Sequence, residues 1–155
     1  MKSTINLFAV SILALCAVAC TPKLVKIYNL HGEPVPHNLT QDQVRRAINI
    51  GAAVAGWSTE DVSPGTIAAT YRIRVHTVIV LISYTQQAYN IDYKTSYQMK
   101  VYCTEEDKEE KRSKKVTTGG GSCPGVAQPA YIHENYNAWI EELNRGIHAA
   151  LHNID

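Results

Sequence analysis

The chain has 155 residues, of which 45% are apolar, and it carries 15 lysines and arginines against 14 aspartates and glutamates. This length fits one domain. The near-zero net charge excludes a strongly basic nucleic-acid-binding protein, and the apolar content excludes a wholly disordered chain.

The N-terminus has the pattern of an export leader. Lys2 gives it a basic start, and the apolar run over 7–18 is too short to span a bilayer. The run ends in Ala17-Val18-Ala19-Cys20, which resembles the lipobox of bacterial lipoproteins. The resemblance implies cleavage of residues 1–19 as a lipoprotein signal peptide and acylation of Cys20, so that the protein binds a membrane through a lipid anchor. An ordinary signal peptide cleaved after residue 19 is the alternative.

The residue after the cysteine bears on which membrane of the cell envelope the protein is sent to. Thr21 in this position resembles the pattern of enterobacterial lipoproteins that are sent to the outer membrane. We therefore expect a protein of the bacterial cell envelope, anchored by lipid in the outer membrane and facing the periplasm.

Residues 20–39 are rich in proline and include Gly32. This composition predicts a tether that follows the lipidated cysteine, with a short strand over 24–28 as the one possible ordered piece. The remainder, 40–155, is predicted to form a single domain.

The domain begins with a predicted helix over 40–56. Thr40-Gln41-Asp42-Gln43 fits a capping box, and apolar or small residues then recur at helical spacing. Gly56 is expected to end the helix in a left-handed conformation.

Three strands are predicted next. Apolar and polar residues alternate over 67–75 and again over 89–97, whereas 77–84 is apolar on both faces for most of its length. The short turns between these segments predict an antiparallel meander with 77–84 in the middle.

A charged loop is predicted over 103–130. After loss of the leader, ten of the 28 charged side chains fall between residues 105 and 115, and three glycines follow at 119–121. From Ile132 onward apolar residues recur every three or four positions, which predicts a second amphipathic helix.

These elements predict an α+β domain of helix, three-stranded antiparallel meander and helix. Both helices are expected on one face of the sheet, because the two outer strands each have one polar face. The expected open face carries Arg72, Arg74, Asp92 and Lys94.

Cys103 and Cys123 flank the charged loop and are predicted to form a disulfide, since the protein is exported. A pair of metal-binding or redox thiols is the alternative. His148 and His152 are spaced to chelate a metal on the last helix, but only two ligands are visible. We expect them to complement the helix dipole instead, and no metal site or cofactor is predicted.

Tyrosine is used almost to the exclusion of phenylalanine. Most tyrosines fall in the predicted sheet, where a phenol suits a surface that binds sugar or peptide. Tyr71 and Tyr93 are therefore candidate binding residues. Strand propensity and a thin core are the structural alternative.

Several segments between residues 40 and 150 resemble a family of small bacterial lipoproteins of unassigned function. They are Gly56-Trp57, Pro64-Gly65-Thr66-Ile67, Tyr89-x-Ile91-x-Tyr93 and, most specifically, Ile132-His133-x-x-Tyr136-Asn137-x-Trp139. The resemblance implies an exported α+β domain without a known activity. His133 and Asn137 are candidate binding residues in this motif, and docking of the last helix is the alternative role.

No catalytic motif supports an enzyme: the nucleophile elbow of hydrolases is absent, and 119–121 lacks the lysine of a phosphate loop. The sequence favours a non-enzymatic envelope protein that binds another envelope component, either a protein or a glycan. A small-ligand or glycan-binding lipoprotein that uses the sheet tyrosines is the alternative. An enzyme based on His76 or His133 is the third hypothesis.

Overall fold

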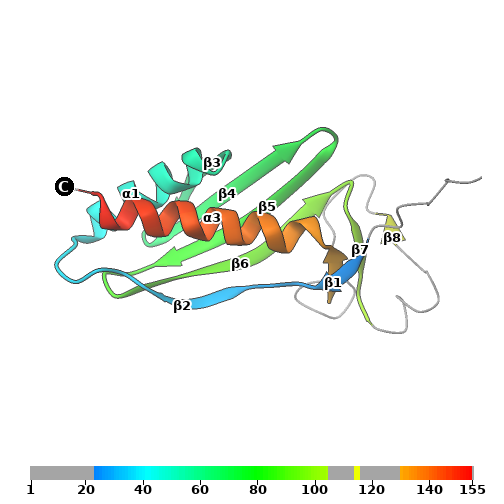
Figure 1. Ribbon diagram of the computed structural model, residues 1–155, viewed down its shortest axis with the longest axis horizontal. Helices are drawn as coiled ribbons and strands as arrows, with labels where there is room; N and C mark the ends of the chain where they lie inside the picture. Colours follow the sequence, from blue (N-terminus) through cyan, green and yellow to red (C-terminus); the bar gives the residue numbers. More distant parts are fainter. Residues whose placement is uncertain (1–22, 105–113, 116–129, 155) are drawn as a thin grey trace, which may run out of the picture.

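The computed structural model describes residues 23–104, 114–115 and 130–154. They form an α+β structure with two helices and two antiparallel sheets (Figure 1). The predicted leader, Cys20, Cys123 and most of the charged loop lie outside the described residues. Neither described helix is long and apolar enough to cross a membrane.

The predicted meander forms the middle of the larger sheet. Strands β4 (Thr66–Ile73), β5 (His76–Tyr84) and β6 (Ala88–Tyr97) pair antiparallel in chain order. Val80 of the central strand lies opposite Ala69 on one side and Tyr93 on the other. This part of the prediction is confirmed.

The prediction of only three strands is wrong, because the sheet has five in the order β2-β6-β5-β4-β3. Strand β3 (Trp57–Ser63) pairs with β4, and β2 (Leu30–Pro34) pairs with β6. Both are edge strands whose side chains are mostly exposed, so they lack the apolar alternation that marks the inner strands.

A smaller sheet has the order β1-β9-β7-β8. It contains β1 (Leu24–Lys26), β7 (Lys100–Tyr102), the two-residue β8 (Lys114–Lys115) and β9 (Tyr131–His133). The tether prediction is therefore wrong for β1 and β2, although β1 falls within the short strand allowed over 24–28. Backbone pairing with β9 and β6 holds these two segments in the domain.

Helix α1 (Gln41–Val54) begins at the predicted capping box. The Thr40 hydroxyl accepts a hydrogen bond from the Gln43 backbone N–H at 3.3 Å, and the Gln43 side chain accepts one from the Thr40 N–H at 2.9 Å. Beyond its C-terminus, Gly56 has φ 81°, as expected for a left-handed residue that ends a helix.

Helix α3 (Asn135–His152) begins three residues later than the periodicity of the sequence suggests. The prediction of a helix from Ile132 is wrong because residues 131–133 pair with β1 and β7 as strand β9. Five apolar side chains of α3 are buried, namely Tyr136, Ile140, Leu143, Ile147 and Leu151.

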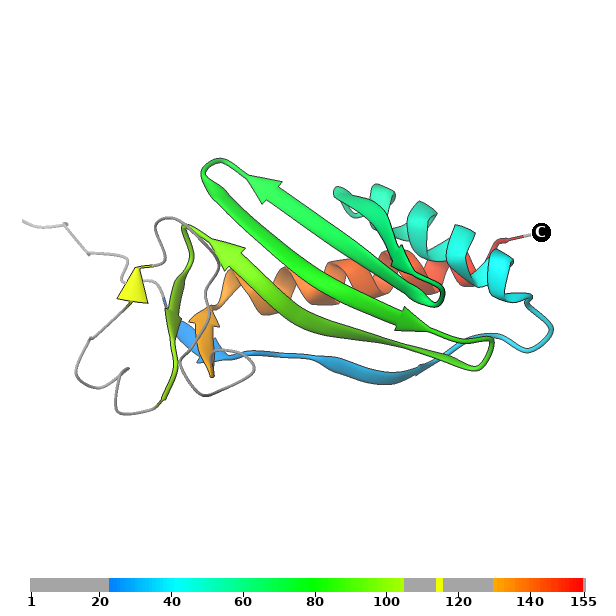
Figure 2. The same ribbon diagram turned by 180° about the vertical axis from the view of Figure 1, so that it is seen from behind.

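Both helices lie on the same side of the five-stranded sheet. They lie in front of it in Figure 1 and behind its strands in Figure 2. The strand side chains that point toward them are buried, including Ile67, Val80, Ile82, Tyr89 and Ile91, and they form one core with the helices. The opposite sheet face, which we call the open face, is covered by neither described helix.

The two helices cross at a pair of glycines. A Cβ added to Gly51 would lie 2.5 Å from the carbonyl carbon and oxygen of Gly146, closer than van der Waals contact allows. The absence of both side chains lets the backbones touch, so that α1 and α3 fit side by side on one sheet face.

We predict that Gly51→Ala destabilises the fold. The substitution raises helix propensity by about 1 kcal/mol, but the clash with Gly146 should outweigh this gain and leave a net loss of about 1–3 kcal/mol. Urea denaturation monitored by circular dichroism measures the change. Ala53→Gly, at an exposed position of the same helix, is the matched control and should cost about 1 kcal/mol through propensity alone. A stabilised Gly51→Ala variant would contradict the close crossing.

Candidate functional site

The four candidate binding residues are not brought together in one pocket of the described structure. Tyr71, on β4, is half-buried in an aromatic stack between Trp57 and Trp139, with ring centroids 5.2 and 5.0 Å away. Its ring therefore contributes packing between the sheet edge and α3.

Tyr93 is buried on the helix side of β6, with 6% of its surface exposed. Its hydroxyl is 2.8 Å from the Ser96 hydroxyl, and its ring meets Tyr136 edge to face at 5.6 Å. Burial raises the pKa of Tyr93 to about 12, so the phenol is neutral at physiological pH. These contacts describe a core residue.

The other tyrosines of β5 and β6 whose side chains point toward the helices are also core residues. Tyr84 and Tyr89 are buried, and burial raises the pKa of each. The Tyr89 hydroxyl donates to Asn144 Oδ1, and Asn144 Nδ2 donates to a Glu33 carboxylate oxygen at 3.2 Å. This chain of bonds ties β6 and β2 to α3. Tyr84, Tyr89 and Tyr93 are therefore used in the core, whereas Tyr97 is half-buried opposite Thr77 on the other side of the sheet.

Asn137 lies in the first turn of α3 and holds the segment between β1 and β2. Its Oδ1 accepts from the Tyr28 backbone N–H at 3.2 Å, and its Nδ2 donates to the Lys26 carbonyl at 3.0 Å. The two bonds satisfy backbone groups of residues 26 and 28 in the way that pairing with a neighbouring strand would. These bonds correspond to the docking role considered for Asn137.

His133 lies at the end of β9, next to the start of α3. Its Nδ1 accepts from the Asn135 backbone N–H at 3.2 Å, which supplies an acceptor at a helix start that has no side-chain cap from Glu134. Burial lowers the pKa of His133, which favours the neutral ring that this bond requires. His76, the first residue of β5, donates from Nδ1 to the Gln98 carbonyl at 2.7 Å.

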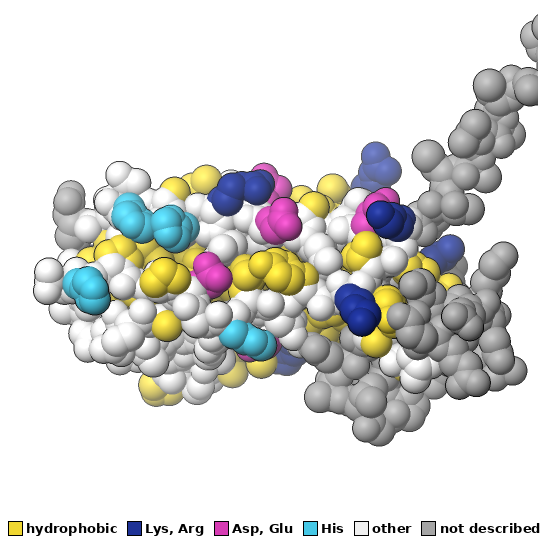
Figure 3. Space-filling view, turned by 60° about the horizontal axis from the view of Figure 1, so that its bottom comes forward, with side chains coloured by type: hydrophobic (Ala, Val, Ile, Leu, Met, Phe, Trp, Pro, Cys, Tyr) yellow, Lys and Arg dark blue, Asp and Glu magenta, His cyan; other side chains and the backbone are white. Residues whose placement is uncertain are grey.

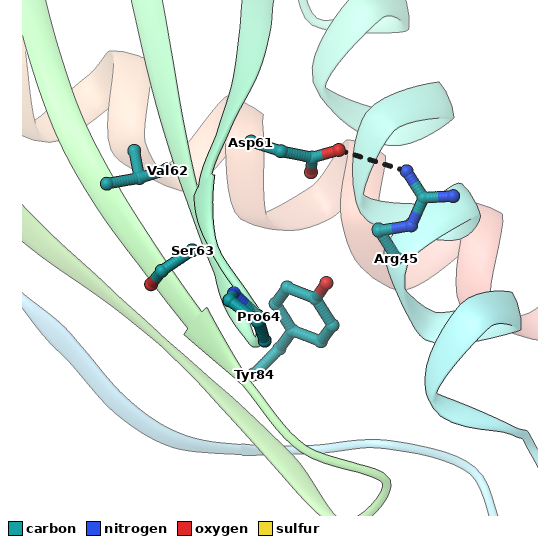
Figure 4. Close-up of a pocket in the computed structure, with 6 residues that line it drawn as sticks. All are labelled: Arg45, Asp61, Val62, Ser63, Pro64 and Tyr84. Carbon is teal, nitrogen blue, oxygen red and sulfur yellow. Dashed lines mark hydrogen bonds and ion pairs between the residues drawn. The ribbon is translucent and has the colours of Figure 1, made fainter.

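One hollow lies between the start of α1 and the β3–β4 turn (Figure 4). It has a volume of about 280 Å³ and is lined by Arg45, Asp61, Val62, Ser63, Pro64 and Tyr84. An adjoining hollow of about 400 Å³ shares Arg45, Pro64 and Tyr84 with it. No pattern in the sequence indicates this hollow, because Arg45 and Asp61 are 16 positions apart on different elements.

The arginine of this hollow is already paired with carboxylates. Arg45 Nη1 donates to Asp61 at 3.1 Å, and its Nε is 3.9 Å from an Asp42 oxygen. Figure 4 shows the Arg45–Asp61 pair above the ring of Tyr84. Burial and the nearby Asp61 carboxylate raise the pKa of Tyr84, so its phenol stays protonated at neutral pH. The arrangement offers no activated nucleophile among the residues that line it.

The strand register places Arg72 and Asp92 on the open sheet face, as expected. Arg74 is in the β4–β5 turn with φ 53°, and Lys94 is exposed at the β-bulge of β6, without a Cα partner on β5. Asp92 Oδ1 is 2.7 Å from His31 Nε2 on the neighbouring strand. One row across the sheet runs Glu60, Ala68, Leu81, Asp92.

The surface in Figure 3 is mixed in charge. Basic, acidic and histidine side chains are interspersed over the described part of the chain in this view, without a large patch of one sign there. Cys103 is disulfide-bonded, while its expected partner Cys123 lies outside the described residues, so the pairing stays a prediction. Within the described part of the chain, no three His, Cys, Asp or Glu side chains gather around a possible metal.

No protein-family model, curated protein or solved structure matches the chain.

We predict that Asn137→Ala lowers stability by about 1–2 kcal/mol, because two hydrogen bonds to the backbone of residues 26 and 28 are lost. The midpoint of thermal or urea unfolding measures this change. Tyr136→Phe is the neighbouring control: the Tyr136 hydroxyl is buried without a hydrogen-bond partner, so its removal should be neutral or stabilising. An Asn137→Ala variant as stable as the wild type would contradict the docking role.

Proposed function

We propose that the protein is a lipid-anchored, non-enzymatic component of the bacterial cell envelope, held in the outer membrane by Cys20 and facing the periplasm. Its domain binds another protein of the envelope through the open face of the five-stranded sheet. The proposal rests on the lipobox-like leader and, for the binding surface, on that face (Figure 2).

The open face is the observation that carries the binding proposal. Five strands present side chains on it, and the central ones, Thr70, Ile79 and Leu81, are half-buried although neither helix covers them. A broad surface of this kind, apolar at its centre and polar at its rim, has the layout of a protein interface.

The charges of the face favour a protein partner. The buried rings of Tyr84, Tyr89 and Tyr93 point to the helix side, whereas the half-buried Tyr97 lies opposite Thr77 on the open side. The face also carries both signs of charge: Glu60 and Asp92 share one row, and Arg72 lies two rows further along β4. A face with both signs of charge favours a protein surface with the complementary charge pattern, and it favours one relative orientation of the two proteins.

The anchor has a direct test. We predict that the wild-type protein incorporates a fatty-acid label in bacterial cells and shows the corresponding mass increase, and that Cys20→Ser abolishes both because serine has no thiol for the thioether. Cys16→Ser, within the same leader, is the matched control and should be labelled as the wild type is. Labelling that survives Cys20→Ser would overturn the lipoprotein reading.

The binding surface is tested by position-specific photocrosslinking in intact envelopes. A crosslinking residue at Thr70, on the open face, should give a discrete adduct with another protein. The same residue at Ala149, which is exposed on α3, should not. Adducts of equal yield at both positions, or none at Thr70, would contradict the sheet face as the interface.

A further inference from the structure

His148 and His152 form a stacked pair near the end of α3. They are one helical turn apart, both are exposed, and their ring centroids are 4.4 Å apart with an interplanar angle of 34°. Two histidines one turn apart on a helix can each give one ring nitrogen to the same ion. Because His148 is exposed, its ring can turn out of the stack about its side-chain torsions to direct a nitrogen toward an ion held by His152. Neither ring contributes to the core or to the sheet face.

A hydrogen bond fixes the tautomer of His152. Its Nδ1 is 2.8 Å from the backbone carbonyl oxygen of His148. A carbonyl only accepts, so Nδ1 must carry the proton. In the neutral ring Nε2 is then left with a free lone pair that faces solvent. Histidines that bind metals usually donate their other ring nitrogen to a carbonyl or carboxylate in this way, because the bond orients the ring and makes it more basic.

The position on the helix favours a cation as well. The last carbonyl groups of a helix carry partial negative charge. Asn153, the C-cap residue, uses its backbone N–H and its side chain on the carbonyls of Ala150 and Ala149. The histidine nitrogens are thus not needed to cap those two groups.

We propose that His148 and His152 bind a divalent transition-metal ion through one ring nitrogen each. Imidazole ligands select Cu²⁺, Ni²⁺ and Zn²⁺ over Mg²⁺ and Ca²⁺, which prefer oxygen. No third His, Cys, Asp or Glu joins the pair within the described residues, so water completes the coordination. The site is exposed and exchangeable, unlike a closed structural zinc site.

The site differs from simple compensation of the helix dipole, which is the role expected from the sequence. A dipole requires only positive charge and is served equally well by arginine. Metal binding requires unprotonated nitrogens at a fixed separation. A variant that keeps the charge and removes the ligand therefore separates the two roles.

The experiment uses the full chain in detergent, without a polyhistidine tag, titrated with Zn²⁺ alone in a calorimeter. We expect saturable binding by the wild type and an affinity at least about ten-fold lower for His148→Ala. This variant removes one ring and leaves the hydrogen bond of His152 in place, because that bond is made to the backbone carbonyl of residue 148 and not to its ring. His152→Arg should also lose binding while circular dichroism shows an intact helix. His37→Ala, at an exposed histidine outside the pair, is the control and should bind as the wild type does.

A second readout locates the ion. Paramagnetic Cu²⁺ should broaden the NMR signals of residues 148–153 first in the wild type and no longer do so in His148→Ala. Absence of saturable Zn²⁺ binding by the wild type, equal affinity of His148→Ala and the wild type, or broadening centred elsewhere would each overturn the proposal.

Discussion

The contact between Gly51 and Gly146 determines how the rest of the domain is arranged. Two helices share one face of a single sheet, and both must reach the buried side chains of the central strands. They can do so only if their backbones come closer than side chains normally permit. Val44, Ala47 and Ile48 then enter the same core as Ile140 and Leu143. The other sheet face is left without a helix because both are used on this one.

Helix α3 also joins the two sheets, and the residues of the segment Ile132-His133-x-x-Tyr136-Asn137-x-Trp139 make the contacts. Ile132 is buried in β9, Tyr136 is buried at the start of the helix, and Asn137 binds the backbone after β1. Trp139 stacks on Tyr71, and His133 accepts from a helix N–H. Each residue of the motif thus has a structural contact. The motif specifies how the helix is docked, and a binding site is not needed to account for it.

The elements that could be predicted from the sequence are those in which local pattern and tertiary environment agree. The alternation over β4 to β6 reflects one buried face, and the capping box reflects bonds between neighbouring residues. Strands β2 and β3 were missed because they are stabilised by pairing with a neighbour rather than by burial of their own side chains. β9 was missed because Ile132 and Tyr136 are four positions apart, a spacing that fits a helix although the first residue is in a strand. The side toward which each tyrosine points depends on the sheet register and the place of the helices, and periodicity alone does not supply either.

The two faces of the sheet carry different kinds of side chain, and this difference limits what the open face can bind. The large rings of Tyr84, Tyr89 and Tyr93 fill the gap beneath the helices, where their area contributes most to the core. The open face has hydroxyl-bearing and aliphatic side chains at its centre, Tyr97 beside Thr77 at one end, and the His31–Asp92 pair near one edge. Such a face supplies shape and charge, with Tyr97 as its aromatic ring, whereas aromatic anchors dominate the binding energy of many interfaces. A protein that binds there would therefore have to bring most of those anchors itself.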